Sequence, residues 1–488
     1  MTYVLGCIVT ELFQEEKSES RKADNEQIQK HFQVTNKLET ADEGDTTTPE
    51  QGLRASLQTI FANKNYRTFL ATAWVFSTFN YLSSYFNLYL RAIGWEVFVI
   101  GVVLSVVSVF SSLFRLSGGY LGDIVDRKKI SVSAFIVLSI YYILIGIFLD
   151  FWILVMTLLI YSVHDLFRSG SSAYIMENVP KEHGGFALSL FTAGRGLSII
   201  SLIVFGFLEP IMGFPETFRF LYIVAGVSLF ISSAIRAYFL DPSVQRQEKS
   251  QKPLFREFYY QNRKAVGLLL AAVPGLISIV VLDTISDSLF KTVALIYANE
   301  VLAIDIAGIN LILVFQLLIS VPLLLKMGRV SDRRGVKSAA IVVYSVMPIS
   351  AALLYFAPTF PVIAPLEVIA AANLLFPSLG VIFTTPFIAI VMKYVNDSLW
   401  AALVLILIRK RLPQTDTAKI LSIFWVVVYI LSSVGPVIAG AIYTFLIPSL
   451  VFLVVLVMNL LILIAIAKGP FGNDNTNSVE TSVTNEYD

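Results

Sequence analysis

The sequence is poor in charge and nearly free of cysteine. Charged residues make up 15% of its 488 residues, whereas ordinary globular chains carry about 25%. This shortage excludes a disordered chain, a coiled coil and a nucleic-acid binder with a basic face. The single cysteine, Cys7, excludes an intramolecular disulfide. Hydrophobic residues reach 56% and the mean hydropathy is +0.73, so the composition indicates a mostly helical integral membrane protein.

The few charges gather in polar segments that divide the chain. Residues 1–65 are rich in Glu, Lys, Gln and Thr, and we expect a cytoplasmic disordered tail that ends in a short interfacial helix. Residues 243–263 form a basic linker between two apolar stretches, 66–242 and 264–468, and a polar tail follows at 469–488. The pattern predicts two membrane domains joined by a cytoplasmic linker.

Each apolar stretch contains six segments long enough to cross a bilayer, whose core of about 30 Å needs about 20 helical residues. The predicted spans are 67–91, 97–117, 131–149, 151–176, 185–208 and 217–240, then 276–298, 307–326, 338–357, 387–408, 418–443 and 449–467. The expected fold is therefore an all-α integral membrane protein with twelve transmembrane helices in two six-helix bundles.

Basic residues predict the orientation of these spans. Lys and Arg concentrate at 127–129, in the linker, at 329–337 and at 409–411. By the positive-inside rule these loops and both tails are cytoplasmic. Only an even number of crossings fits between the last two loops, so the proline-rich stretch 358–385 is predicted to be an extracellular or re-entrant insertion and not a thirteenth span.

A short motif occurs once in each half. The first copy runs Gly119-Tyr120-Leu121-Gly122-Asp123, followed by Asp126 and Arg127, and the second runs Gly328-Arg329-Val330-Ser331-Asp332, followed by Arg333 and Gly335. A second pairing relates His164-Asp165 in the fourth span to Asn396-Asp397 in the tenth. The halves are predicted to be related copies with the same membrane orientation.

The two motif copies resemble the signature loop of the major facilitator superfamily, a Gly-x-Leu-(Ala/Gly)-Asp-Arg-x-Gly-Arg-Lys pattern after the second and eighth spans. The first copy lacks the Arg after Asp123 and has Asp126 where the glycine is expected. The resemblance covers residues 60–468. It implies two pseudo-symmetric bundles, a cavity lined by the first, fourth, seventh and tenth helices, and transport by alternating access.

The resemblance also implies a gating role for the motif residues. A glycine lets helices approach closely, Asp123 caps or pairs at a helix end, and Arg127 has a candidate carboxylate partner in Glu177. The alternative is that Arg127 and the two following lysines only anchor the loop to lipid headgroups. The predicted gating residues are Gly119, Asp123, Arg127, Glu177, Gly328, Asp332, Arg333 and Gly335.

Ionisable residues inside apolar spans are the most specific signal, because each costs about 2.5–3.5 kcal/mol at the bilayer centre. Asp283, Asp287 and Lys291 recur at i, i+4 and i+8 and so share one helix face. Lys393 precedes Asp397 by one turn. The predicted coupling or solute-binding residues are Asn80, Asn87, His164, Asp165, Arg168, Arg195, Asp283, Asp287, Lys291 and Asp397.

Two interpretations of these charges remain open. Carboxylates in a low dielectric can take up and release protons, which makes Asp165, Asp283, Asp287 and Asp397 candidates for proton coupling. Alternatively, Asp165 with Arg168 and Asp287 with Lys291 are structural ion pairs. Arg115 and Arg236, near cytoplasmic helix ends, are predicted to be snorkelling anchors.

The leading functional hypothesis is a secondary transporter of a small charged or zwitterionic solute, coupled to protons. Nucleotide-binding loops are absent from the sequence, and we expect no cofactor, no metal, no enzymatic activity and no nucleic-acid partner. The protein is expected to be a monomer in the lipid bilayer of the plasma membrane.

Three other functions are considered. A multidrug efflux antiporter is the nearest, although the fifth span has Gly194-Arg195-Gly196 without the proline of that signature, and Gly435-Pro436 stands in the eleventh span. An intramembrane magnesium-dependent prenyltransferase would use Asp283 and Asp287 as a diphosphate-binding motif. A sensor without transport activity would use the long acidic tail.

Overall fold

The computed structural model describes residues 60–167, 190–191, 194–242, 274–334, 336–411 and 417–468, and their secondary structure is helical apart from one isolated β-bridge. The all-α fold is thus confirmed. Its main helices are α4 (Lys64–Asn80), α5 (Phe86–Ala92), α6 (Val97–Ile124), α7 (Arg127–Ile147), α8 (Phe151–Phe167), α11 (Ser198–Met212), α12 (Phe214–Phe239), α14 (Pro274–Glu300), α15 (Ile306–Arg334), α16 (Val336–Phe356), α17 (Leu366–Leu375), α18 (Thr385–Arg411), α19 (Thr417–Ser432), α20 (Val434–Phe445) and α21 (Leu450–Lys468).

Nine helices in the described part of the chain are long and apolar enough to cross a membrane, judged by length and composition. Others fall on predicted spans but are interrupted or cut short. The first predicted span consists of α4 and α5 joined by the 3₁₀ helix η2 (Tyr81–Tyr85). The eleventh, whose segment Val426–Phe445 is one of the nine, divides into α19 and α20 just before Pro436. A helix-interior proline lacks the N–H of a helical hydrogen bond, which accounts for the second break. The total of twelve spans stays a prediction.

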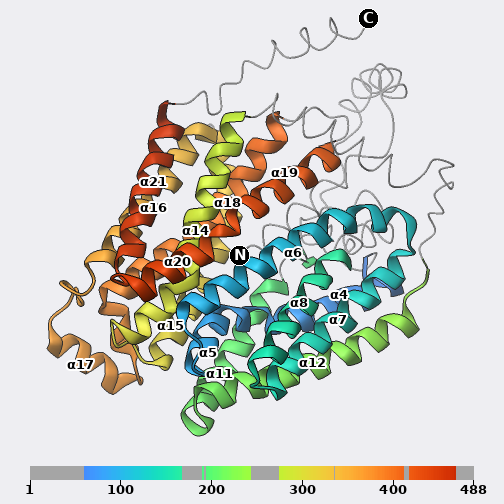
Figure 1. The fold of residues 1–488 in the computed structure, drawn as a ribbon, viewed down its shortest axis with the longest axis horizontal. Helices are drawn as coiled ribbons and strands as arrows, with labels where there is room; N and C mark the ends of the chain where they lie inside the picture. The colour runs from blue at the N-terminus through green and yellow to red at the C-terminus, as the bar shows by residue number, and fades with distance from the viewer. Residues whose placement is uncertain are drawn as a thin grey trace, which may run out of the picture.

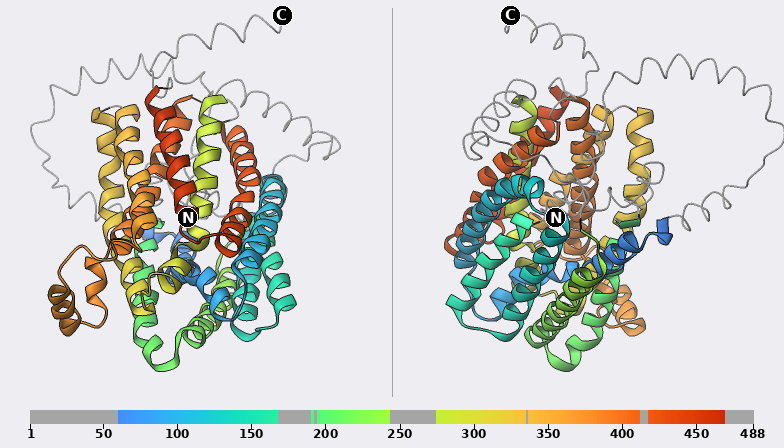
Figure 2. Two further views of the ribbon diagram at one scale, coloured as in Figure 1. Left: turned by 60° about the vertical axis from the view of Figure 1, so that its left-hand side comes forward. Right: turned by 90° about the vertical axis from the view of Figure 1, so that its right-hand side faces the viewer.

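The helices form two groups, α4 to α12 and α14 to α21, which lie side by side in Figure 1 and Figure 2. Within the first group α7 packs on α12 and α6 on α8, and within the second α16 packs on α18 and α21. The groups meet where α6 contacts α20 and α19, and where α11 contacts α15. We call the two groups the N half and the C half.

Among the described residues, polar contacts between the halves concentrate away from the basic loops, at what we call the far end. Arg91 at the end of α5 forms an ion pair with Glu300 at the end of α14, at 2.6 Å. Tyr443 of α20 donates a hydrogen bond to the same Glu300 carboxylate at 2.9 Å. Two glycines permit close packing nearby, because a Cβ on Gly101 would lie 2.2 Å from the Pro436 carbonyl oxygen and one on Gly440 2.7 Å from that of Val97. The halves are therefore held together at the far end.

The predicted insertion folds as a hairpin at the far end of the C half. It contains α17 and the 3₁₀ helix η5 (Leu379–Phe383), which pack on each other between α16 and α18. Figure 1 shows α17 projecting beyond the bundle, and the left view of Figure 2 shows the same segment in orange. With ten residues, α17 is about 15 Å long and too short to cross a bilayer core of about 30 Å, which agrees with the prediction that this stretch is not a span.

Candidate functional site

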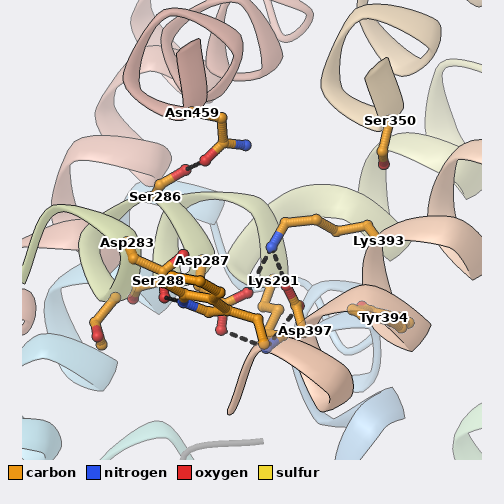
Figure 3. Close-up of polar contacts among 12 residues, drawn as sticks. Asp283, Ser286, Asp287, Ser288, Lys291, Ser350, Lys393, Tyr394, Asp397 and Asn459 are labelled. Atoms are coloured by element: carbon orange, nitrogen blue, oxygen red, sulfur yellow. Dashed lines mark hydrogen bonds and ion pairs between the residues drawn. The ribbon is translucent and has the colours of Figure 1, made fainter. Parts of the chain in front are cut away.

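Four charged side chains from α14 and α18 form a closed ring of alternating sign (Figure 3). Lys393 lies between Asp287, at 2.9 Å, and Asp397, four residues along its own helix. Lys291 lies between Asp397, at 3.0 Å, and Asp287, again four residues away. We call these four residues the charge ring. Two acids and two bases give it no net charge, which is the condition under which ions are tolerated in an apolar bundle.

The two helices of the charge ring differ in side-chain exposure. The side chains of Lys393 and Asp397 are 1% and 2% exposed, whereas those of Lys291 and Asp287 are 22% and 19% exposed. The α18 pair is therefore sealed inside the C half, and the α14 pair keeps polar atoms accessible. A charged group that reaches the ring must meet Lys291 or Asp287 first.

Asp283 lies one turn before the charge ring and has different partners. The Tyr344 hydroxyl of α16 donates to one of its oxygens at 2.9 Å, and Trp400 Nε1 of α18 donates to the other at 2.8 Å. Both donors are neutral. Tyr344 also lies 3.1 Å from Oδ1 of Asn459 on α21, which in turn accepts a hydrogen bond from Ser286 at 2.9 Å. We call Asp283, Tyr344, Trp400 and Asn459 the Asp283 network.

The sequence places these groups together through helical spacing. Asp283, Asp287 and Lys291 follow one another at intervals of four, so one face of α14 carries all three, and that face meets α18. Lys393, Asp397 and Trp400 likewise share a face of α18. The predicted triad on α14 and the pair on α18 are thus brought into one site. The ion-pair interpretation holds for Asp287 with Lys291, but each member also pairs across to α18.

The N half touches this site through its first predicted span. Asn87 Nδ2 donates to the backbone carbonyls of Lys291 and Thr292, at 3.3 and 3.2 Å. Gln316 of α15 donates to the Tyr81 hydroxyl at 3.1 Å. Asn80 ends α4 where the 3₁₀ turn begins, so Asn80 and Asn87 do not lie on one continuous α-helix. Arg195 is half-buried in a 3₁₀ turn, within electrostatic range of Tyr81.

The fourth predicted span is joined to a neighbouring helix by an ion pair that was not predicted. Asp165 is buried and forms an ion pair with Arg115 of α6, at 2.8 Å. The guanidinium of Arg115 also lies over the Tyr429 ring of the C half, 4.7 Å from its centroid. The prediction that Arg115 snorkels to the headgroups is therefore wrong, because a buried carboxylate on a neighbouring helix holds it. His164 is buried and stacks on Tyr161, and Arg168 lies outside the described residues.

Arg236 was also predicted to be a snorkelling anchor, and this is wrong. Its side chain is fully buried in the N half, where it donates to the hydroxyls of Thr72 and Ser131 at 2.8 and 2.6 Å. The guanidinium plane lies over the rings of Phe69 and Phe135, with centroid distances of 4.3 and 3.6 Å. Cation–π contacts and hydroxyl acceptors stabilise the charge inside the bundle.

The structure describes the predicted gating residues only in part. Glu177 and Gly335 lie outside the described residues. Gly119, Asp123, Gly328, Asp332 and Arg333 lie on the helical ends of α6 and α15, where side chains are not described. Arg127 begins α7, which is capped by Asp126 through a hydrogen bond to the backbone N–H of Lys128 at 2.9 Å. The preceding Gly118 makes the close helix contact, since a Cβ there would lie 2.4 Å from the Leu166 carbonyl oxygen of α8.

Sequence reasoning missed three members of the site. Tyr344 and Trp400 carry no formal charge, so the search for ionisable residues in apolar spans passed over them. Asn459 did have a usable signal, because it is a lone polar residue in the apolar helix α21. In the eleventh predicted span, Gly435 packs on Ser288 of α14, and Gly440 packs on α6.

The chain resembles known membrane transporters in sequence profile and in fold. The sequence profile of the Major Facilitator Superfamily matches residues 68–399. Among curated proteins no relative matches. Solved structures with a similar fold include the nucleoside transporter NupG in a mutant form, at 12% identity and a TM-score of 0.60, covering 84% of this chain and 99% of that one. They also include the human organic anion transporter MFSD10, at 12% identity and a TM-score of 0.52, covering 86% of this chain and 100% of that one. A bacterial homologue of the human lysosomal transporter Spinster matches at 14% identity and a TM-score of 0.52, covering 87% of this chain and 96% of that one.

Proposed function

Because the chain belongs to the Major Facilitator Superfamily, and is therefore a membrane transporter of the secondary kind and not an enzyme, we propose that it couples the movement of a small charged or zwitterionic solute to protons. The observation that carries this proposal is that the acidic residues of α14 and α18 differ in their partners. Two acids belong to the charge ring, and Asp283 lies outside it with neutral donors.

Charge balance favours Asp283 as the proton carrier. Protonating Asp287 or Asp397 would leave the buried Lys393 with one carboxylate in place of two. Removing one partner of a buried ion pair is destabilising by about 3–5 kcal/mol. Protonating Asp283 breaks none of the ion pairs of the charge ring, and it removes a negative charge from the bundle interior.

The hydrogen bonds of Tyr344 depend on whether Asp283 is protonated. Its hydroxyl has a single proton and two acceptors in reach, Asp283 and Asn459. When Asp283 is ionised, Tyr344 donates to it. When Asp283 is protonated, its O–H donates to the Tyr344 oxygen, and Tyr344 donates to Asn459 Oδ1. One proton thus changes the hydrogen bonds that join α14, α16 and α21.

The alternating signs of the charge ring support a charged or zwitterionic solute. A solute with one cationic and one anionic group can replace the accessible Lys291 and Asp287 as partners of each other, so that no charge is left unpaired during exchange. A neutral sugar has no such means of opening the ring. The nucleoside and organic anion transporters share only the fold at their low identity, and they do not select a solute for this chain.

Contacts between the halves support alternating access. The Arg91–Glu300 pair, the Tyr443 hydrogen bond and the Gly101 and Gly440 contacts all lie at the far end. Asn87 links this closed end to the backbone of Lys291 in the charge ring. Rocking of one half against the other would break these contacts and move Asn87 away from the ring.

Proteoliposomes with an imposed pH gradient test the proposal. Wild type, Asp283→Asn and the control Ser398→Ala are assayed with radiolabelled amino acids, dipeptides and organic anions, with glucose as the neutral comparison. We expect gradient-driven accumulation of a charged or zwitterionic compound by wild type and the control. Asp283→Asn should lose accumulation but retain exchange of internal for external solute. Absence of gradient-driven flux for all compounds, or undiminished accumulation by Asp283→Asn, would refute the coupling.

A further inference from the structure

The far-end hairpin, residues 358–377, exposes an unusual amount of apolar surface. Leu374 and Leu375 are 90% and 83% exposed. The other exposed large apolar side chains of this segment are Phe360, Val362, Ile363, Leu366, Val368 and Phe376. Glu367 is the single charged residue between Pro358 and Pro377. Soluble surfaces rarely leave a patch of this kind in contact with water.

The hairpin is held in place at its base, so these side chains cannot fold back onto the bundle. Val362 and Thr384 form a β-bridge, and the N–H of Ile363 donates to the Phe383 carbonyl at 2.9 Å. At the other end, the Asn373 side chain accepts from the N–H of Gly380 at 2.7 Å. Ser378 donates to Asp305 at the start of α15. Only the face of α17 that carries Ile369 and Ala372 packs inward.

The exposed surface continues the lipid-facing surface of α16. Val342, Ile349 and Phe356 are exposed, apolar and spaced by seven, so they form one stripe along a helix of membrane-spanning length. Phe360 and Ile363 follow directly after the end of this stripe. No polar segment separates the helix from the hairpin.

We propose that the hairpin is inserted into the lipid at the far end, with α17 lying among the acyl chains near the headgroups. The absence of Lys and Arg between 358 and 384 excludes attachment to anionic headgroups through charge. A protein partner would need one apolar face, whereas α17 is apolar on several sides, with Glu367 in its first turn and Asn373 as its two polar residues. A helix that is apolar all round is typical of a lipid or core environment.

Spin-label accessibility tests this proposal without reference to transport. In a Cys7→Ser background, a nitroxide is attached at Leu374→Cys, with the protein in nanodiscs of neutral phosphatidylcholine. Three reference sites are labelled in parallel: Ile349→Cys on the lipid-facing stripe, Glu96→Cys in an exposed loop, and the buried Ala372→Cys. Collisions with oxygen, which concentrates in lipid, are compared with those of a water-soluble nickel chelate.

The Leu374 label should match Ile349, with high oxygen and low nickel accessibility. A label at Leu375 should give the same result, which guards against a local effect of one substitution. Nickel accessibility like that of Glu96 would overturn the proposal in favour of an aqueous hairpin. Low accessibility to both reagents, as at Ala372, would also overturn it, because the surface would then be covered by protein.

Discussion

Trp400 donates the N–H of its indole to Asp283 at 2.8 Å, although 117 residues separate the two in the chain. Trp400 thus fixes one oxygen of a carboxylate whose other oxygen is held by Tyr344. The same helix, α18, supplies Lys393 and Asp397 to the charge ring. The proposed proton site and the proposed solute site therefore share the helices α14 and α18 but no ion pair.

Tyr344→Phe is predicted to change the pH dependence of transport more than its maximum rate. The substitution removes a donor that favours the ionised form of Asp283. The protonated form is then populated at higher pH, so the pH of half-maximal transport should move upward. Rates of proton-driven uptake measured from pH 5 to 8 provide the test. An unchanged profile with a uniformly lower rate would mean that Tyr344 has a packing role alone.

Lys393→Met is predicted to destabilise the protein strongly. It leaves Asp287 and Asp397 with Lys291 as the one remaining ammonium of the ring, and the loss should be about 3–5 kcal/mol. Thermal unfolding in detergent should show a lower Tm than for Ser398→Ala on the same helix. The double variant Lys393→Met with Asp397→Asn should recover part of the loss because it restores neutrality. No recovery would show that the lysine acts through packing and not through charge.

Helical spacing explains why part of the site was predictable. The stripe of Asp283, Asp287 and Lys291 follows from the period of an α-helix alone, as does the pairing of Lys393 with Asp397. The joining of the two pairs into a ring depends on the register between α14 and α18, which local sequence does not contain. Nor does local sequence show that Tyr344 reaches Asp283 from α16, or that Asn459 reaches Tyr344 from α21.

Arg115 illustrates the same limit in the N half. Its position near a helix end suggested a headgroup anchor, but its partner Asp165 lies 50 residues away on α8. Arg236 was misjudged for a related reason, because the rings and hydroxyls that stabilise it come from α4 and α7. Composition and motif spacing suffice for the fold class and family. Pairings between helices require coordinates.

Arg91→Glu is predicted to loosen the closed far end, and the charge swap with Glu300→Arg should restore it. The pair is about one-third exposed, so its contribution is at most about 1 kcal/mol. That suffices to change the ratio of two states of similar energy by about fivefold. Distances between spin labels at Glu96 and Ile447, one in each half, should lengthen in the single variant and return in the swap. A swap that stays open would show that the ion pair does not hold the far end.

Gly101→Ala is predicted to prevent full closure of the far end. The added Cβ would lie 2.2 Å from the Pro436 carbonyl oxygen, and this backbone contact between α6 and α20 cannot relax by side-chain rotation. Gly196→Ala is the matched control, since nothing lies within 4 Å of its added Cβ. Solute binding should survive in both variants, whereas the rate of transport should fall in Gly101→Ala alone. Equal rates would show that closure at this contact is not required for transport.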